Sequence, residues 1–391
     1  MRTASGQSRT GRTPDGVIVS IRPLDQAVPM LGAWRDLGHA ALVENLFFEA
    51  DFAMSAARAF GAGIRIVTVS DRPPDEPGAR LLALWPCRIV HRWGVPLPAL
   101  MGWTHGFSIF GAPLLARDEA ERGLKGLLDA PRALGLPRRL LMPYLPLDGP
   151  FAALLDRTLS ETRQRRTDFW SHERGFLDVS GNEASARKNY LDVNVSPRKA
   201  AQLARFFRRM SAGGVVEHEI VRDPRALTEA LADYVTLETA GWKGRAGTAV
   251  GRRPAEVGFL NGLIASYGER GCVRIDRLRR DGRSLASSLA LETASTLWFL
   301  KISYDEAEAK NSPGAQLVER VTRSLLADNR IETADSCAPP NFPLIETFWG
   351  ERRRLAHGLI EAGGGDRLFR LAASLEGLRA QASRLRTGGP A

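Results

Sequence analysis

The residues Ser312, Pro313 and Gly314 have the types and order of a helix start that could bind an anion. Serine is favoured just before the first helical turn, and proline at the first helical position gives up only an N–H that has no helical partner. Glycine lets a ligand approach the backbone closely. The N–H groups of Gly314, Ala315 and Gln316 would then face a phosphate, helped by the positive end of the helix dipole. Taken alone, the tripeptide also fits an ordinary capped helix.

The elements around this tripeptide place its helix directly after a sheet. In chain order, the pattern predicts a helix at 256–269, strands at 271–280, 284–292 and 296–304, a loop at 305–311, a helix from residue 312 and a strand at 330–335. The strand TLWFLKISY is apolar on both faces, as expected of a central strand. The helix that follows it is amphipathic, with Leu317, Val318, Val321 and Leu325 on one face.

The first half of the chain repeats this order more faintly. It predicts a helix at 34–60, strands at 63–70, 79–90 and 103–115, a helix at 118–134 and a strand at 139–144. Such a repeat is typical of a duplicated unit. Residues 148–194 look irregular, and two more helices are predicted at 197–212 and 366–385.

These elements predict a five-part chain. The parts are a tail at 1–15, an N-terminal domain at 16–150, a linker at 151–184, a C-terminal domain at 185–355, and a C-terminal helix and tail at 356–391.

The composition argues against membrane and metal-dependent classes. A hydrophobic content of 44% and a charged content of 25% are typical of soluble globular proteins. No apolar run approaches the roughly 18 residues needed to cross a bilayer, and residues 1–15 lack the apolar stretch of a secretory signal. The three cysteines form no CxxC and the six histidines are dispersed, so neither a disulfide framework nor a metal site is expected.

The net charge of +10 comes mainly from arginine. Its main explanation is a genome that prefers arginine codons, and the functional alternative is a basic surface for a nucleotide cofactor, tRNA or membrane headgroups. The excess is densest at 163–166 and 198–209. Charge alone does not indicate nucleic acid.

Several motifs of the second half resemble those of the CelD/BcsL-like acetyltransferases of the GNAT superfamily. One is FLKISYD at 299–305 followed by SPG at 312–314, and another is ETAGWKG at 238–244 continuing to GTA at 247–249. The SPRK sequence at 196–199 and Asp335 followed by Trp349 agree with them. The motifs extend over about residues 185–350 in the family's order.

The resemblance implies an α/β fold of the α+β type: two tandem GNAT-like domains, each a mixed, mostly antiparallel sheet flanked by helices, as in the related FemAB-like transferases. Acetyl-CoA or another acyl-CoA would lie where the third and fourth strands splay apart. The residues implied to bind it are Ile302, Ser303, Ser312, Pro313, Gly314, Ala315 and Gln316. The short SPG sequence replaces the longer glycine-containing phosphate loop that most GNAT enzymes use.

Acyl transfer requires an oriented amine, a route for its proton and a group that stabilises the tetrahedral oxyanion. Asp335 is the first candidate for the base and Glu238 the second, although isolated carboxylates are often structural. Lys301 could stabilise the oxyanion or bind an acidic substrate, and Tyr304 could give a proton to the leaving thiolate. No Cys–His or Ser–His–Asp arrangement can be made out, which favours direct attack on the thioester.

Four further residues are candidates for the acceptor site. Lys243 could contact a phosphate or the acceptor, and Trp242 could form a wall of the cleft. The alternative is a core tryptophan beside a solvated lysine. Thr248 and Trp349 complete the set.

The sequence therefore predicts a cytoplasmic N-acyltransferase that uses acyl-CoA and no metal. Its acceptor would be an amine on a small molecule, an amino sugar or a polysaccharide or cell-envelope precursor. One alternative is a FemAB-like transferase that takes aminoacyl groups from tRNA, and another is a non-catalytic protein of the same fold. No DNA partner and at most peripheral membrane contact are expected, and the oligomeric state stays open.

Overall fold

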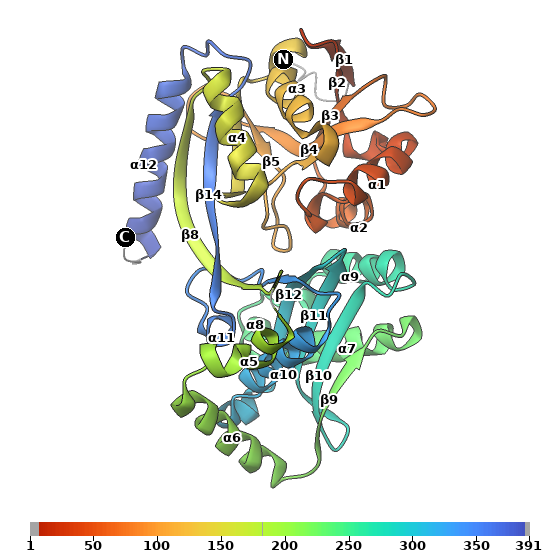
Figure 1. Cartoon of the computed structure of the whole chain (residues 1–391), viewed down its shortest axis with the longest axis vertical. Helices are drawn as coiled ribbons and strands as arrows, with labels where there is room; N and C mark the ends of the chain where they lie inside the picture. Colours follow the sequence, from red (N-terminus) through yellow and green to blue (C-terminus); the bar gives the residue numbers. More distant parts are fainter. Residues whose placement is uncertain (1–7, 182, 388–391) are drawn as a thin grey trace. The chain divides into compact units, whose positions relative to one another are not determined.

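A computed structural model of the chain describes residues 8–181 and 183–387 (Figure 1). The chain divides into two units, Met1–His172 together with Arg354–Ala391, and Glu173–Arg353. Each unit contains a mixed, mostly antiparallel sheet flanked by helices, which confirms the predicted fold class. The long strands β8 (Arg166–Asp178) and β14 (Glu351–Glu361) each begin in one unit and end in the other.

In the first unit the strands lie in the order β1, β2, β3, β4, β5, β7 and β14, and β6 pairs with β4. Neighbours are antiparallel except β5 and β7, which are parallel. The strands other than β14 are β1 Arg9–Arg12, β2 Ile18–Pro23, β3 Arg65–Ser70, β4 Leu81–Val90, β5 Ala99–Gly102, β6 Leu114–Leu115 and β7 Arg139–Pro146. The α-helices are α1 Leu31–His39, α2 Ala50–Phe60, α3 Ala120–Ala133, α4 Gly149–Glu161 and α12 Phe369–Thr387.

In the second unit the order is β8, β13, β12, β11, β10 and β9. Only the β12–β13 pair is parallel. The strands other than β8 are β9 Val216–Val221, β10 Val273–Arg280, β11 Arg283–Thr293, β12 Thr296–Tyr304 and β13 Thr333–Asp335. The helices are α5 Ala184–Asn194, α6 Pro197–Ser211, α7 Pro224–Ala240, α8 Trp242–Arg245, α9 Pro254–Tyr267, the 3-10 helix η6 Glu306–Asn311, α10 Pro313–Ala327 and α11 Pro343–Glu346.

Helices α10 and α7 flank this sheet (Figure 1). The aliphatic face predicted for α10 is confirmed, because Leu317, Val318, Val321 and Leu325 are all buried. They share one core cluster with Leu297 and Phe299 of β12. Helix α7 contacts β10, β11 and β12 and buries Leu227 and Tyr234, which lie outside that cluster. The two faces of β12 therefore meet different helices.

The second-half predictions match the observed elements closely. Strand β12 has the predicted bounds, and α9, β10, β11 and the start of α10 lie within two residues of theirs. Two details differ. The predicted loop 305–311 contains η6, and β13 begins at Thr333 instead of residue 330.

The first-half predictions were wrong in two places. Residues 34–60 form two helices, α1 and α2, and residues 103–113 are largely irregular instead of a strand. Trp103 and Phe107 are nevertheless buried, and the Asn45 side chain donates to the carbonyls of Phe110 and Ala112 at 3.2 and 2.6 Å. A loop that packs its aromatic side chains inward has the apolar pattern of a strand, so periodicity could not separate the two.

Residues 148–194, predicted to be irregular, contain α4, β8 and α5. Most residues of β8 are polar and partly exposed, as in the run RTDFWSHER. The strand forms because its backbone pairs with distant strands, such as β13 in the second unit. A polar strand of this kind lacks the alternation that identifies strands in a sequence.

Strand β13 has only three residues and is held by buried charges. The Asp335 carboxylate lies 2.7 Å from Nε of Arg174 and 2.6 Å from a guanidinium nitrogen of Arg353, and it accepts the Cys337 N–H at 2.9 Å. Asp335 is fully buried. Burial alone would raise the pKa of this carboxyl, but the charges of Arg174 and Arg353 outweigh it and lower the pKa.

Replacing Asp335 with asparagine should lower the free energy of unfolding by about 3–5 kcal/mol, because two largely buried guanidinium groups lose their counter-charge. Chemical denaturation measures this change. The wild-type contribution is fully present above the unfolded pKa of about 3.9 and is lost as the pH falls through the lower folded pKa.

The matched control is Asp328→Asn, which breaks an exposed pair with Arg330 at 2.7 Å. It should change the stability by at most about 1 kcal/mol. An Asp335→Asn protein that is as stable as the wild type would contradict the anchoring role.

Candidate active site

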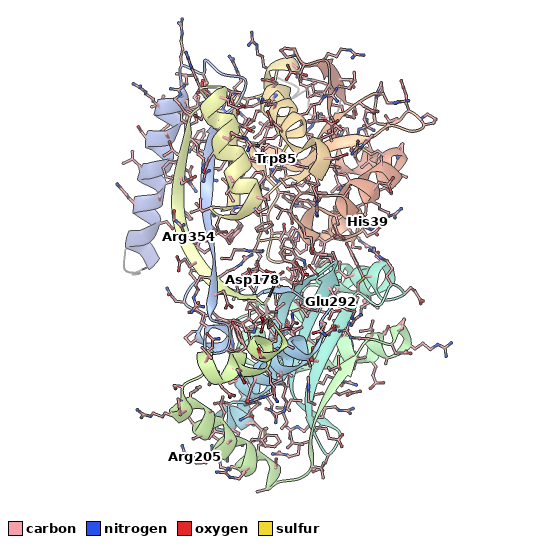
Figure 2. All side chains as sticks on the ribbon, in the orientation of Figure 1. His39, Trp85, Asp178, Arg205, Glu292 and Arg354 are labelled. Atoms are coloured by element: carbon pink, nitrogen blue, oxygen red, sulfur yellow. The ribbon has the colours of Figure 1, made fainter. Side chains whose placement is uncertain are left out.

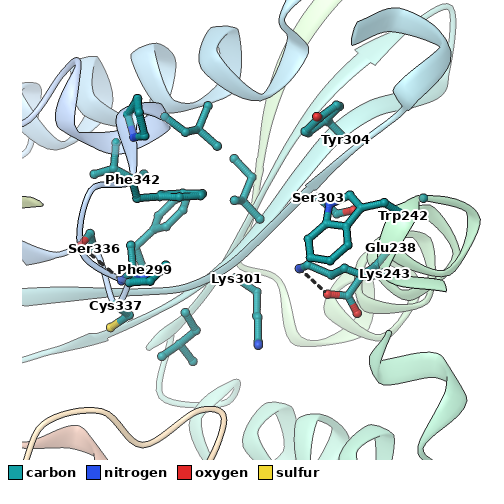
Figure 3. A pocket seen from close by; sticks show the side chains of 18 of the residues that line it. Glu238, Trp242, Lys243, Phe299, Lys301, Ser303, Tyr304, Ser336, Cys337 and Phe342 are labelled. Carbon is teal, nitrogen blue, oxygen red and sulfur yellow. Dashed lines mark hydrogen bonds and ion pairs between the residues drawn. The ribbon is translucent and has the colours of Figure 1, made fainter. Parts of the chain in front are cut away.

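The edge of β12 is open beyond Trp298. Strand β13 pairs with β12 only at residues 296–298, after which the chain turns away through Ser336 and Cys337. Among the strands in the described residues, none pairs with this edge from residue 299 to 304. A cavity of about 510 Å³ lies there, lined by residues 299–304, by the junction of α7 and α8, and by segments within 336–345 (Figure 3). Open backbone N–H and C=O groups can hydrogen-bond an extended ligand.

A β-bulge in β12 decides where its side chains point. Lys301 lies opposite Leu289, but Phe299 lies opposite the next residue, Ala290, so Leu300 is the extra residue. In a regular strand, residues two apart share a face, and Lys301 would point the same way as Phe299. Because the bulge adds one residue, Lys301 and Phe299 lie on opposite faces of β12. Phe299, Ile302 and Tyr304 pack with the α10 core, whereas Tyr304 and Lys301 point to opposite sides of the strand (Figure 3).

The α10 side of the cavity is apolar. Its wall contains Ile302, Tyr304, Phe342 and Leu344, all packed against the α10 core. The first turn of α10 lies directly behind this wall, because a Cβ built on Gly314 would be 3.3 Å from the Tyr304 ring and 3.6 Å from Leu344. This side suits the uncharged, flexible arm of a ligand.

The α7 side of the cavity contains a buried ion pair. Glu238 accepts hydrogen bonds from the Lys243 ammonium at 2.7 Å, the Val250 N–H at 2.8 Å and the Tyr234 hydroxyl at 3.0 Å. Burial alone would raise the pKa of Glu238, but these donors, Lys243 first among them, lower it. Both residues were predicted for the site and both line the cavity. With its oxygens engaged in this way, Glu238 is a weak proton acceptor.

Lys301 points toward the same charged side. Burial lowers the pKa of its ammonium group below 10.5, and the positive charge of Lys243 lowers it further, while Glu238 and Glu256 act in the opposite direction. An ammonium group in this position can stabilise negative charge that develops at the β12 edge.

Trp242 stands at the mouth of the cavity and is 56% exposed. Its backbone N–H donates to the Glu306 carboxylate at 2.5 Å, and the same carboxylate pairs with Arg245 at 2.6 Å. Glu306 thus ties α8 to the end of β12. The alternative of Trp242 as a core aromatic was wrong, because an exposed ring beside a cavity is a wall residue.

Asp335, the first candidate for the base, does not line the cavity. Its oxygens are engaged by Arg174, Arg353 and the Cys337 N–H, and its pKa is lowered. A fully buried carboxylate held by two guanidinium groups cannot take a proton from a substrate without losing those interactions. The geometry gives it an anchoring role instead.

Helix α10 begins at Pro313, but Ser312 does not cap it as expected. Ser312 has left-handed dihedral angles (φ 50°, ψ 54°), and its side chain makes no capping hydrogen bond. Gln316 donates its backbone N–H to the Ser312 carbonyl at 3.1 Å and its side-chain amide to Leu203 at 2.7 Å. The N–H groups of Gly314 and Ala315 find no acceptor within residues 8–181 and 183–387. Residues 312–316 do not line the cavity, so the anion site there stays a prediction.

Thr248 and Trp349, predicted to contact the acceptor, are not brought to the cavity. The N–H and hydroxyl of Thr248 both donate to the Lys243 carbonyl, at 2.8 and 3.3 Å, and close the turn after α8. Trp349 is fully buried, donates to the Thr322 hydroxyl at 2.9 Å and packs edge-on against Phe299. Their roles here are turn closure and core packing.

The sequence reasoning missed the wall within residues 336–345, which includes Cys337, Pro339 and Phe342. The signal was a proline-rich loop at the carboxyl end of a parallel strand, where α/β sheets often bind ligands. Burial and the neighbouring Asp335 carboxylate raise the pKa of the Cys337 thiol well above its usual range. A protonated thiol is a poor nucleophile, which fits direct attack better than an acyl-enzyme.

Two kinds of feature are absent from the described part of the chain. It contains no group of three or more His, Cys, Asp or Glu side chains placed to hold a metal ion. None of its helices combines the length and apolar character needed to cross a membrane.

Comparison with known proteins agrees with this geometry. Residues 197–341 match the model of the family described as "Acetyltransferase (GNAT) domain". The match contains β12, α10 and β13 and most of the cavity wall. No curated protein matches the sequence.

Two solved structures have a similar fold over most of the chain. One is the C-terminal domain of a putative lysylphosphatidylglycerol synthetase from Agrobacterium fabrum, 12% identical with a TM-score of 0.54, covering 92% of this chain and 97% of that one. The other is FemX, 10% identical with a TM-score of 0.57, covering 88% and 98%. At these identities the similarity concerns the fold alone. The family match thus shows a GNAT acetyltransferase domain at residues 197–341, within the second unit, and supports an acyltransferase.

Proposed function

We propose that the second unit transfers an acyl group from acyl-CoA to an amine by direct attack on the thioester. The observation that supports this most is the open edge of β12, which separates an apolar wall on the α10 side from a charged wall on the α7 side. Acyl transfer brings an apolar, extended donor and a polar acceptor together at one point. The cavity has a suitable surface for each.

The donor, acetyl-CoA or another acyl-CoA, lies on the α10 side. Its pantetheine arm runs along the open backbone of Ile302, Ser303 and Tyr304, where it can add hydrogen bonds as an extra strand would. Its phosphates extend toward the N–H groups of Gly314 and Ala315, behind the Tyr304 ring.

The acceptor amine enters on the α7 side, between Trp242 and Lys301. Its nitrogen attacks the thioester carbon, a C–N bond forms, and the Lys301 ammonium stabilises the oxyanion. When the C–S bond breaks, the leaving thiolate takes its proton from solvent, because Tyr304, predicted to supply it, points to the opposite side of the strand from Lys301 (Figure 3). The amine proton leaves through solvent, because Glu238 is already held by three donors.

The acceptor belongs to a small molecule, an amino sugar or a polysaccharide or cell-envelope precursor. This class follows from the CelD/BcsL-like resemblance of the motifs around Trp242 and Lys301. Use of acyl-CoA places the reaction in the cytoplasm.

FemAB-like transfer of an aminoacyl group from tRNA is the second candidate. It is favoured by the arginine-rich helix α6, and by the similar fold of a domain whose name refers to lysylphosphatidylglycerol synthesis. Competition between tRNA and acyl-CoA for the protein separates the two candidates.

Acetyl-CoA at 100 times its dissociation constant should stabilise the protein by about 2.7 kcal/mol. Thermal unfolding with and without acetyl-CoA measures the shift. ADP, which lacks the pantetheine arm, serves as the control and should give a smaller shift at equal concentration. No shift with CoA thioesters at millimolar concentration would refute the proposal.

Lys301→Met should lower kcat by about 10²- to 10³-fold and leave the KM for acyl-CoA nearly unchanged, because the oxyanion forms only in the transition state. Lys301→Arg keeps a positive charge and should retain part of the activity. Steady-state kinetics with a reactive amine measures both.

The pH dependence of kcat distinguishes a charged Lys301 that stabilises the oxyanion from a neutral Lys301 that acts as a base. The pKa of Lys301 is lowered below 10.5, so wild-type kcat should fall as the pH rises through that lowered value, when the ammonium loses its charge. In Lys301→Arg the fall should move to higher pH, since arginine stays protonated. A wild-type kcat that rises through the same pH range would instead make neutral Lys301 a base and contradict the oxyanion role.

A further inference from the structure

Helix α6 presents a face of unpaired positive charge. It carries Arg198, Lys199, Arg205, Arg208 and Arg209 and no acidic residue. Within the described chain, none of these five side chains forms an ion pair with a carboxylate. The first four line a surface hollow of about 730 Å³ that runs along the helix.

The arginines on the sheet of the second unit differ from those of α6 in this respect. Most arginines of its sheet are paired with carboxylates, such as Arg274 with Asp276 at 2.6 Å, Arg277 with Asp233 at 2.7 Å and Arg280 with Glu308 at 2.8 Å. Like charges one helical turn apart, such as Arg205 and Arg208, repel each other. Leaving these arginines without carboxylate partners brings no gain in stability, and the hollow that four of the five basic side chains line is open to an external anion.

The C-terminal end of α6 adjoins the start of α10. Arg209 donates its Nε–H to the Asn311 side chain at 2.6 Å and also binds the Lys310 carbonyl. Further along, the Gln316 side chain donates to Leu203 of α6. Arg205 and Arg209 both lie over the Phe206 ring, at 5.5 and 5.1 Å. Figure 2 marks Arg205 on α6.

The start of α10, where a phosphate site is predicted, offers few hydrogen-bond donors. Pro313 has no N–H, the Gln316 N–H is used within the helix, and only the N–H groups of Gly314 and Ala315 have no acceptor in the described residues. Two amides cannot balance the several negative charges of a CoA nucleotide. Arginine side chains are well suited to phosphate, because the planar guanidinium group binds it with two parallel hydrogen bonds.

We propose that Arg205 and Arg208 of α6 bind the nucleotide phosphates of the acyl-CoA donor, with Arg209 fixing the helix against the start of α10. This assignment rests on the proposed function and names the element that holds the donor's charged end. The SPG turn is short and offers few backbone N–H groups to the phosphates. The guanidinium groups on α6 therefore bind phosphate charge that the backbone of a longer glycine-rich loop would otherwise bind.

The test measures the dissociation constants of acetyl-CoA and its 3′-dephospho form by calorimetry, for the wild type and for the double variant Arg205→Gln/Arg208→Gln. Loss of two charge-assisted hydrogen bonds should weaken acetyl-CoA binding by about tenfold or more. Removing the 3′-phosphate should raise the dissociation constant by a smaller factor in the variant than in the wild type. Arg225→Gln, which removes another exposed arginine of this unit with no carboxylate ion pair in the described residues, is the matched control and should bind as the wild type does.

The outcomes separate this assignment from the proposed function. A wild type that binds acetyl-CoA and a double variant that binds it equally well would overturn the assignment alone. A wild type that binds no acyl-CoA would overturn the proposed function, and the assignment with it. Loss of tRNA binding with unchanged acetyl-CoA binding would show that α6 serves a nucleic acid, which also overturns the assignment. Turnover with acetyl-pantetheine, which has no nucleotide, should be equal in the double variant and the wild type.

Discussion

The buried pairing of Asp335 with Arg174 and Arg353 is the interaction on which the site depends. It holds the three-residue strand β13 in parallel beside β12, and the pairing of the two strands ends at Trp298, opposite Asp335. Arg174 comes from β8, which pairs with β13 but lies 161 residues earlier in the sequence, and Arg353 comes from β14. Because the chain then turns away at Ser336, the rest of the β12 edge keeps its hydrogen-bonding groups open along a cavity.

The bulge at Leu300 gives the two sides of this edge different chemistry. With it, Ile302 and Tyr304 face the apolar core of α10, and Lys301 faces the Glu238–Lys243 pair. The charged side is organised before any ligand binds, since Glu238 is held by three donors. Polar groups that are already oriented need little rearrangement when charge develops in a transition state.

Sequence patterns predicted the elements of the second unit well where the hydrophobic pattern within a segment decides its structure. The run at 296–304 is apolar on both faces because β12 is central, and α10 has a clear amphipathic period. The same reasoning missed β8, whose polar residues give no alternation, and mistook the aromatic loop at 103–113 for a strand. In both cases the backbone conformation depends on contacts with residues far away in sequence.

By itself, the sequence determined the order of elements in the second half, the resemblance of its motifs to GNAT acetyltransferases, and seven residues of the cavity: Glu238, Trp242, Lys243, Lys301, Ile302, Ser303 and Tyr304. Only the tertiary structure decided which of these share a face. It also decided that Asp335 is an anchor and Trp349 a core residue. The physical reason is that a carboxylate's role depends on the cations folded against it, and a strand residue's direction depends on one bulge that no local pattern reveals.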